Sequence, residues 1–421
     1  MYTYVDVHLG LKIIITRILM SSNRKTKKIL ITLFIAIFSS TLGSGLVVPL
    51  LPGYAHTMGA SGFLIGMIFG AFSLSRTVML PLVGFLSDSR GRKPFITLGL
   101  FIYFIASVLF IFADNIAFLI IIRFIQGGAA AMILPIAQAY AGDITPHEKE
   151  GTVMGLVHLA LYGGLSSGPV LGGFVKDTCG IDASFMSMGL ICFSGFILSI
   201  YFLPPVTLEV SASLAGGPGQ YLSMMKDRRV TGLFIFRLAY TMCIGSIWSF
   251  APLIADIKFH MESMAIGIVI TLSVLISAVL MTPMGILADR GNKKILMIAG
   301  GGITAASMFI LAMVEYPWQL YLVSVVIGIG GGISVPSVMA VTVIAGRKYG
   351  SMASMMSLLT LSHSFGMMAG PVIIGLMMDM LNVGIAFAMS GVLMFIATLL
   401  IPWLIFGENE SPADSISSEA G

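Results

Sequence analysis

"GFLSDSRGRK", residues 84–93, is the most polar short stretch in the first half of a largely apolar chain. It returns 201 residues further on as "GILADRGNKK", residues 285–294. The second copy lacks one residue after the aspartate, so Asp88 corresponds to Asp289. Self-similarity at a fixed separation is the mark of an internal repeat.

Two further matches fall in the same register. "SGPVLGGFVKD", residues 167–177, returns as "AGPVIIGLMMD", residues 369–379, and Pro135 corresponds to Pro336. Shared hydrophobicity does not readily produce three matches at separations of 201 or 202 residues. We therefore interpret the chain as two halves related by duplication.

The composition indicates that both halves lie in a membrane. Of the 421 residues, 57% are hydrophobic and 10% are charged, whereas soluble domains carry about 25% charged residues. Apolar runs near the roughly 20 residues that cross a bilayer recur along the whole chain. They are apolar all round rather than alternating, which favours helices over the strands of a β-barrel.

Gly, Pro and charged residues divide the chain into twelve apolar segments, each of which is predicted to form a membrane-spanning helix. We expect an all-α polytopic membrane protein built from two pseudo-symmetric six-helix bundles, with the substrate path between them near the midplane. The spans are expected near 29–51, 62–83, 94–113, 117–139, 151–175, 184–204, 231–254, 263–286, 295–314, 318–342, 351–377 and 382–406.

The positive charges predict the orientation. Eighteen of the 23 Lys and Arg residues fall in the N-terminal tail or the even-numbered loops, and only Lys176 and Lys258 fall in the loops of the other side. The remaining three, Arg76, Arg123 and Arg237, lie inside spans. Because cytoplasmic loops are enriched in Lys and Arg, both termini are expected in the cytoplasm, with the protein in the plasma membrane.

The spans and the composition also predict the domain organisation. The first 19 residues are expected to be an upstream extension of a natural start at Met20, with an interfacial amphipathic segment as the alternative. The expected parts are an N-terminal cytoplasmic tail (1–28), a first bundle (29–204), a Pro-, Gly- and Ser-rich linker (205–230), a second bundle (231–406) and an acidic tail (407–421).

Four motifs together resemble those of the major facilitator superfamily and of its twelve-helix drug:proton antiporters. They are "LGSGLVVPLLP" (42–52), "GFLSDSRGRKP" (84–94), "RFIQGGAAA" (123–131) and "GGLSSGPVLGG" (163–173). The resemblance implies a secondary transporter whose two bundles rock to expose a central site alternately to each side. It also implies exchange of the substrate against protons.

The stretch between the second and third spans is expected to act as a conformational latch. Asp88 can cap the positive N-terminus of a helix in the facing bundle, and the resemblance implies the same role. Cations in this stretch can also simply set the topology. The candidate residues are Gly84, Asp88, Arg90, Gly91, Arg92 and Lys93, with Gly285, Asp289, Arg290 and Gly291 as counterparts.

Two motifs lie inside spans. Arg123 is costly in an apolar helix and is therefore expected to face the cavity, with Gln126 on the same helix face; the alternative is that Arg123 binds helix-end carbonyls. Helix five carries small residues at a spacing of four, which makes a flat face for close packing. Its motif comprises Gly164, Gly168, Pro169, Gly172 and Gly173, and a gating role for it rests on the resemblance.

No acidic residue lies in the middle of a span, although many drug antiporters of this type carry one in helix one. Three residues are the alternatives: His158 and His363 inside spans, because a histidine can titrate near neutral pH, and Asp143 at the cytoplasmic end of helix four. Arg76, Arg123 and Arg237 would favour an anionic or zwitterionic substrate if they face the cavity. Further candidates for the cavity wall are Tyr162, Tyr240 and Trp248.

The sequence therefore predicts a secondary transporter that exports small amphiphilic compounds in exchange for protons. A porter for an organic anion or anionic metabolite and a non-transporting membrane sensor are the alternatives. No ATP-binding loop, catalytic constellation or metal-ligand spacing is apparent, and the three cysteines show no disulfide pattern. We expect no enzyme activity, cofactor or nucleic-acid partner, and a monomer surrounded by lipid.

Overall fold

The computed structural model describes residues 24–145, 150–204, 223–349 and 352–406. Within these ranges the chain is helical without strands, and twelve helices are long and apolar enough to cross a membrane. This confirms the predicted all-α polytopic fold. The expected extension, most of the linker and the acidic tail lie outside the described residues.

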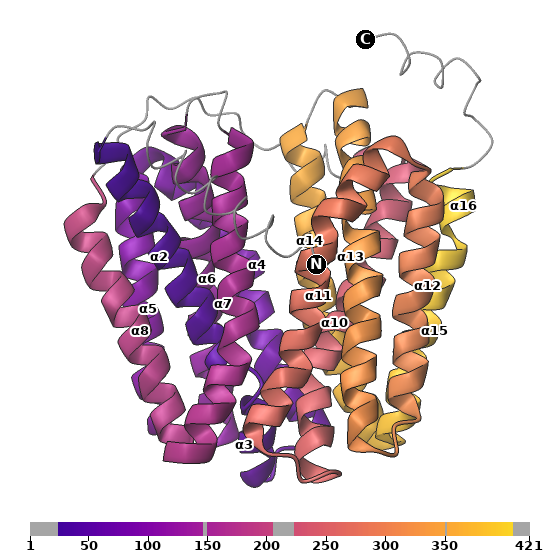
Figure 1. Ribbon diagram of the computed structural model, residues 1–421, viewed down its shortest axis with the longest axis horizontal. Helices are drawn as coiled ribbons and strands as arrows, with labels where there is room; N and C mark the ends of the chain where they lie inside the picture. Colours follow the sequence, from indigo (N-terminus) through magenta and orange to yellow (C-terminus); the bar gives the residue numbers. More distant parts are fainter. Residues whose placement is uncertain (1–23, 146–149, 205–222, 350–351, 407–421) are drawn as a thin grey trace, which may run out of the picture.

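The first half of the chain forms one group of helices (Figure 1). The first span consists of two helices, because the chain turns at residues 48–50, around Pro49, which has no N–H to donate. The helices are α2 (Arg24–Val47), α3 (Leu51–Thr57), α4 (Gly62–Arg90), α5 (Arg92–Ile111), α6 (Ile116–Asp143), α7 (Glu150–Cys179) and α8 (Ile181–Phe202).

The second half forms the other group, beside the first (Figure 1). Here the last span is the divided one, with Pro402 in the first turn of its second piece. The helices are α10 (Arg228–Ile257), α11 (Ser263–Arg290), α12 (Lys293–Ala312), α13 (Pro317–Lys348), α14 (Met352–Met380), α15 (Val383–Leu399) and α16 (Ile401–Leu404).

The polar stretch at 84–93 is mostly helical, which corrects the expectation of a loop. Helix α4 continues to Arg90, and only Gly91, with a φ of 87°, separates it from α5. A left-handed φ of this kind suits glycine, which has no Cβ to clash. Residues 285–290 likewise form the last turns of α11. The end of the apolar run at residue 83 marks the predicted limit of the lipid, whereas α4 itself continues to Arg90.

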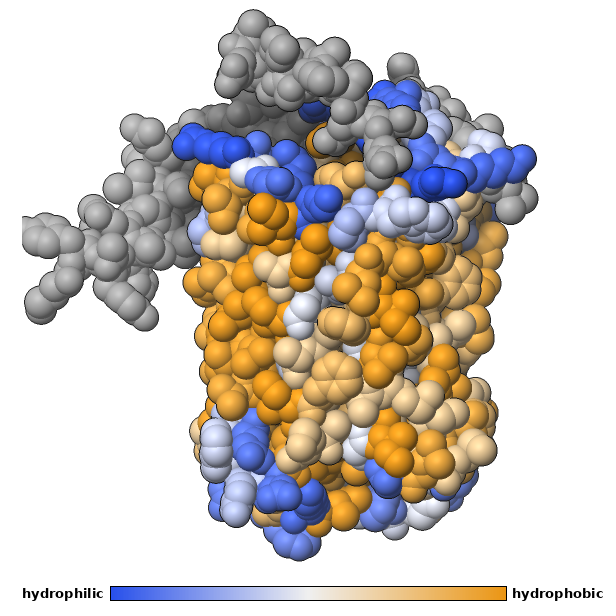
Figure 2. All heavy atoms as spheres, turned by 90° about the vertical axis from the view of Figure 1, so that its right-hand side faces the viewer, coloured by the Kyte–Doolittle hydropathy of each residue, from blue (hydrophilic) through white to orange (hydrophobic). Residues whose placement is uncertain are grey.

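The surface matches a membrane environment. Figure 2 shows a broad hydrophobic band between two hydrophilic ends. Large apolar side chains within the spans are exposed, as at Val279 with 65% of its surface accessible. We call the end that carries Arg90–Lys93, Arg228–Arg229 and Arg290–Lys294 the basic end, and the other the opposite end. In Figure 1 the basic end is uppermost, and the bundles lie apart there and meet below.

Candidate functional site

A cavity of about 340 Å³ lies between the two bundles. It is near mid-depth, because Arg76, which lines it, is the middle residue of α4. Both bundles contribute to its wall. Six of the side chains proposed from the sequence line it, namely Arg76, Tyr162, Arg237, Tyr240, Trp248 and His363.

Arg237 is the best-defined polar group of the cavity. Its Nη2 lies 3.3 Å from Nδ1 of His363, and its guanidinium lies 5.7 Å from the ring centroid of Tyr240. Its buried Nε has no hydrogen-bond partner in the part of the chain described. Arg76 comes from the other bundle, so the cavity receives one guanidinium from each half.

Arg123 lies beside this cavity rather than in its wall. Only 3% of its surface is exposed, and it borders a smaller cavity of about 80 Å³ that Arg76 and His363 also line. Its Nη1 donates to Oε1 of Gln126 at 2.7 Å, so the two side chains share a helix face as predicted. The guanidinium lies 4.3 Å from the ring centroid of Phe72. This pair is therefore buried between helices.

His158 lies outside the cavity, which corrects its place among the cavity candidates. It is on the same face of α7 as Tyr162, one turn nearer the basic end, where its side chain is exposed. Its Nδ1 lies 2.9 Å from the carbonyl oxygen of Met154 in its own helix. Position along the helix separates it from the site.

Three of the motif glycines of α7 bring that helix against α2 in the same bundle. A Cβ on Gly164 would lie 2.1 Å from Oγ1 of Thr41, and one on Gly172 would lie 2.1 Å from the carbonyl oxygen of Leu46. Gly168 faces the backbone of Gly45. The spacing of four thus produces a face on which no side chain fits.

The other two residues of that motif face the second bundle. A Cβ on Gly173 would lie 2.1 Å from the carbonyl oxygen of Ser263, and one on Gly267 would lie 2.2 Å from that of Pro169. We call this contact between α7 and α11 the first seam. Because no side chain separates them, the two backbones meet directly.

The repeat builds a second seam between α4 and α14. A Cβ on Gly66 would lie 2.3 Å from the carbonyl oxygen of Pro371, and one on Gly375 would lie 2.1 Å from that of Gly62. Pro371 and Gly375 are the counterparts of Pro169 and Gly173, 202 residues later. Each half therefore supplies the same backbone surfaces to the contact between the bundles.

A carboxylate caps a helix of the facing bundle in each seam. Asp177 accepts from the backbone N–H groups of Ser263 and Met264, at 3.0 and 2.7 Å. Asp379 accepts from those of Gly62 and Phe63, at 2.7 and 2.8 Å. Both carboxylates thus lie at the positive N-terminus of a helix.

Asp177 and Asp379 are the last residues of the repeated segments 167–177 and 369–379. They occupy span ends, where acidic residues are common, so their residue type and position give no reason to assign them a function. The available signal was their equivalence. An acid kept at the same place in both halves, next to the same Gly-Pro segment, pointed to a contact made twice.

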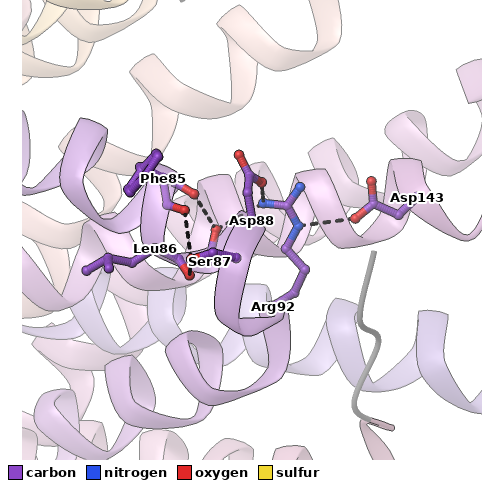
Figure 3. Close-up of polar contacts among 8 residues, drawn as sticks. Phe85, Leu86, Ser87, Asp88, Arg92 and Asp143 are labelled. Atoms are coloured by element: carbon purple, nitrogen blue, oxygen red, sulfur yellow. Dashed lines mark hydrogen bonds and ion pairs between the residues drawn. The ribbon is translucent and has the colours of Figure 1, made fainter. Parts of the chain in front are cut away.

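The basic end holds a different set of contacts (Figure 3). Arg92 pairs with Asp88, donates to Oδ2 of Asp143 at 3.1 Å and donates to Oγ of Ser87 at 2.9 Å. Asp88 is 52% exposed, and its partner belongs to its own bundle. The predicted cap on the facing bundle is therefore not formed in this conformation.

The remaining residues of the polar stretch also keep to their own bundle. Lys93 donates to the carbonyl oxygen of Ile200 at the end of α8, at 2.7 Å, and Arg90 is exposed. Asp289 and Arg290 are exposed, and neither has an ion pair or hydrogen bond through its side chain among the described residues. Gly84 has open space where a Cβ would lie.

Hydrogen bonds between the bundles lie nearer the opposite end. Across the described residues they comprise the two from Asp177, the two from Asp379 and one from Oγ1 of Thr271 to the carbonyl oxygen of Ser166. The seams are formed by the first turns of α4 and α11, which lie at the opposite end. The bundles are thus joined on one side of the cavity.

In the second bundle, Asp227 caps the start of α10. It accepts from the backbone N–H of Arg229 at 2.7 Å and from the hydroxyl of Tyr349, and Nζ of Lys348 lies 3.9 Å away. Partial burial opposes ionisation, but these three partners outweigh it and lower the pKa of Asp227 below its usual value. Burial and the same hydrogen bond raise the pKa of Tyr349 to about 12.

No group of three or more His, Cys, Asp or Glu residues suited to a metal ion occurs among the described residues. The arrangement offers instead a cavity between two joined bundles, with cationic and aromatic groups in its wall. Such a space can bind a small amphiphilic molecule.

Comparison with known proteins gives the same picture. The family model of the Major Facilitator Superfamily matches residues 33–257 and 233–421. An uncharacterized MFS-type transporter, MJ1560, of Methanocaldococcus jannaschii is 28% identical over 89% of this chain and 98% of its own. Multidrug resistance protein 2 of Bacillus subtilis is 27% identical over 94% and 99%.

A solved structure shares the fold. A bacterial homolog of the human lysosomal transporter Spinster, in an inward-facing and unoccupied conformation, superposes with a TM-score of 0.77 at 14% identity. The match covers 93% of this chain and 100% of that one. The twelve helices, the repeat and the match to the family model along both halves place the chain in the Major Facilitator Superfamily.

Proposed function

We propose that this transporter exports small amphiphilic compounds from the cytoplasm in exchange for protons. The similarity to Multidrug resistance protein 2 supports export of this kind. The observation that carries the proposal is the cavity of about 340 Å³ between two bundles that are joined by hydrogen bonds on one side of it. Transport by alternating access needs such an arrangement.

The charge distribution supports the orientation. The basic end carries most of the Lys and Arg residues, so we assign it to the cytoplasm and place the protein in the plasma membrane. The joined opposite end then faces outward, and the structure corresponds to a state that loads from the cytoplasm. The surrounding partners are lipids, and we expect a monomer.

Export requires both seams to part. Asp177 and Asp379 would leave the N-termini of α11 and α4, and the basic ends of the bundles would approach one another. Asp88 and Asp289 are exposed at the ends of α4 and α11, where a helix of the facing bundle would then come near. The latch expected of Asp88 would thus operate in the outward-facing state.

His363 is our candidate for the proton carrier. Among the described residues that line the cavity it is the only histidine, the side-chain type whose ordinary pKa lies closest to neutral pH. Its Nδ1 faces Arg237, so protonation of His363 would place two cations 3.3 Å apart. Repulsion between protonated His363 and Arg237 would therefore couple proton binding to a shift in the position of Arg237.

Reconstitution into liposomes with an imposed pH gradient tests the proposal. We expect accumulation of aromatic amphiphiles driven by the gradient, and its loss in His363→Gln with binding retained. His158→Gln is the matched control, because that histidine lies outside the cavity on α7. Gradient-driven transport by His363→Gln equal to that of the wild type would rule out His363 as the carrier.

A further inference from the structure

The wall of the cavity carries positive charge without a matching negative charge. Arg76 and Arg237 both line it, one from each bundle, and no Asp or Glu occurs among the residues that line either cavity. Every ion pair between described side chains lies at the basic end. The two guanidiniums therefore face the site with no carboxylate as counter-ion.

The acidic residues are far away along the helices. On α4, which begins at Gly62, Arg76 is 14 residues from the end that Asp379 caps and 12 residues from Asp88. At a rise of 1.5 Å per residue these distances are about 21 and 18 Å. Arginine inside a membrane protein ordinarily faces a partner or an aqueous path, and among the described residues no carboxylate lines either cavity to be that partner.

The hydrogen-bonding capacity of Arg237 is also unfilled. Its neighbours are the ring of Tyr240 and Nδ1 of His363, and its buried Nε has no partner among the described residues. A guanidinium presents a planar set of donors that fits two oxygens of one carboxylate. A bound anion would fill both needs, because it would accept a hydrogen bond from the unpaired Nε and supply the negative charge that the wall lacks.

Building on the proposed function, we propose that the transported compound is an amphiphilic anion whose carboxylate or sulfonate binds between Arg76 and Arg237. Its apolar part would lie against Tyr162, Tyr240 and Trp248, which line the same space. Aromatic walls also attract cations, but a cation here would meet two guanidiniums. The charge of the wall selects against it.

The chain offers a reporter for this binding. It has three tryptophans, and only Trp248 lines the cavity, while Trp318 and Trp403 are exposed at 60% and 61%. The variant Trp318→Phe/Trp403→Phe leaves Trp248 as the single emitter. Quenching is measured in nanodiscs with three probes of one shape: 4-(4-nitrophenyl)butanoate, its neutral amide and 4-(4-nitrophenyl)butylammonium.

The anion is expected to bind at least tenfold more tightly than the amide, and the ammonium more weakly than both. Arg237→Gln or Arg76→Gln should lower affinity for the anion by roughly 10- to 100-fold, as expected for loss of a hydrogen bond to a charged group. Affinity for the amide should change little. Arg237→Lys keeps a charge and should recover part of the preference.

The wild-type preference among the three probes needs no variant at the site, so it tests the inference even where an arginine variant fails to fold. Tightest binding of the ammonium, or equal binding of all three, would overturn it. The proposed function is tested separately by gradient-driven uptake of the same probes. Uptake of the amide or ammonium without a preference for the anion would refute the anionic substrate alone, and binding without any uptake would refute the export.

Discussion

The two carboxylate caps of the seams can be removed together. In the double variant Asp177→Ala/Asp379→Ala, the N-termini of α11 and α4 lose four hydrogen bonds from the facing bundle. Under the proposed mechanism, the state with the joined opposite end makes these bonds and the outward-facing state does not. The substitution should therefore shift the balance between the two states of the transporter, leaving each bundle folded.

The size of the shift follows from the geometry. Removing the side chain that caps a helix N-terminus costs about 1 to 2 kcal/mol, and hydrogen bonds to a charged group contribute about 1.5 to 3 kcal/mol. We take about 2 kcal/mol for each cap. The two caps lie on different helices and share no partner, so their effects should add to about 4 kcal/mol. That sum changes the equilibrium by roughly a thousandfold.

Spin labels across the opposite end provide the assay. Asp114 and Glu315 are exposed, lie between helices at that end, and occupy equivalent places 201 residues apart in the repeat. Labels are attached at Asp114→Cys and Glu315→Cys, with the exposed Cys179 replaced by Ser. Pulsed electron paramagnetic resonance in nanodiscs should show one distance before the double substitution and a dominant longer distance after it.

Matched controls separate the caps from charge. Asp182→Ala removes an acid from the first turn of α8 at the same end and should leave the distances unchanged. Asp177→Asn/Asp379→Asn keeps one acceptor at each site and should give a smaller shift. An unchanged distance in the double alanine variant would refute the reasoning, because the caps would then not hold this end together.

Three other changes test separate parts of the structure. Gly66→Ala places a Cβ 2.3 Å from the carbonyl oxygen of Pro371, so it should open the second seam at a cost of about 1 to 3 kcal/mol and reduce transport. The control Gly302→Ala, whose Cβ meets no atom within 4 Å, should not reduce it. Equal transport rates for the two variants would contradict a close seam. Asp88→Asn breaks a half-exposed pair worth under about 1 kcal/mol, so thermal stability should hold while transport falls sharply, and full transport would exclude the latch. The lowered pKa of Asp227 means that its stabilising contribution is present above the usual aspartate pKa near 3.8 and is lost as the pH falls through the lower folded value. The melting temperature of Asp227→Asn should thus lie below that of the wild type at pH 6, and the difference should narrow below pH 4. A constant difference would show that the charge is not responsible.

The sequence was informative about the fold because hydropathy and charge act along the chain. Twelve spans and the pairing of the halves follow from apolar length and from the repeat, and six cavity residues follow from polar and aromatic groups at mid-span. Helix ends were harder to predict, because hydropathy marks the limit of the lipid. Helix α4 accordingly runs seven residues past the predicted limit at residue 83.

Partners across the interface could not be predicted in the same way. Asp88 was expected to meet the facing bundle, and it pairs with Arg92 instead, because that choice depends on which end of the transporter is joined. His158 was placed in the cavity by residue type, although one helical turn puts it outside. The partner of Asp88 depends on the relative position of the two bundles and the exposure of His158 on its position along α7, and residue type alone encodes neither.

The seams have a consequence for the speed of transport. Where glycine faces a carbonyl on the neighbouring helix, as at Gly66 and Gly267, the surfaces carry no interlocked side chains. At these points the two bundles meet backbone to backbone, so their separation there releases no interlocked side chain. The barrier to reorientation would come mainly from exchanging a few polar contacts with water, so turnover should respond strongly to the hydration of the outer rim as long as no side chain is added at these glycines.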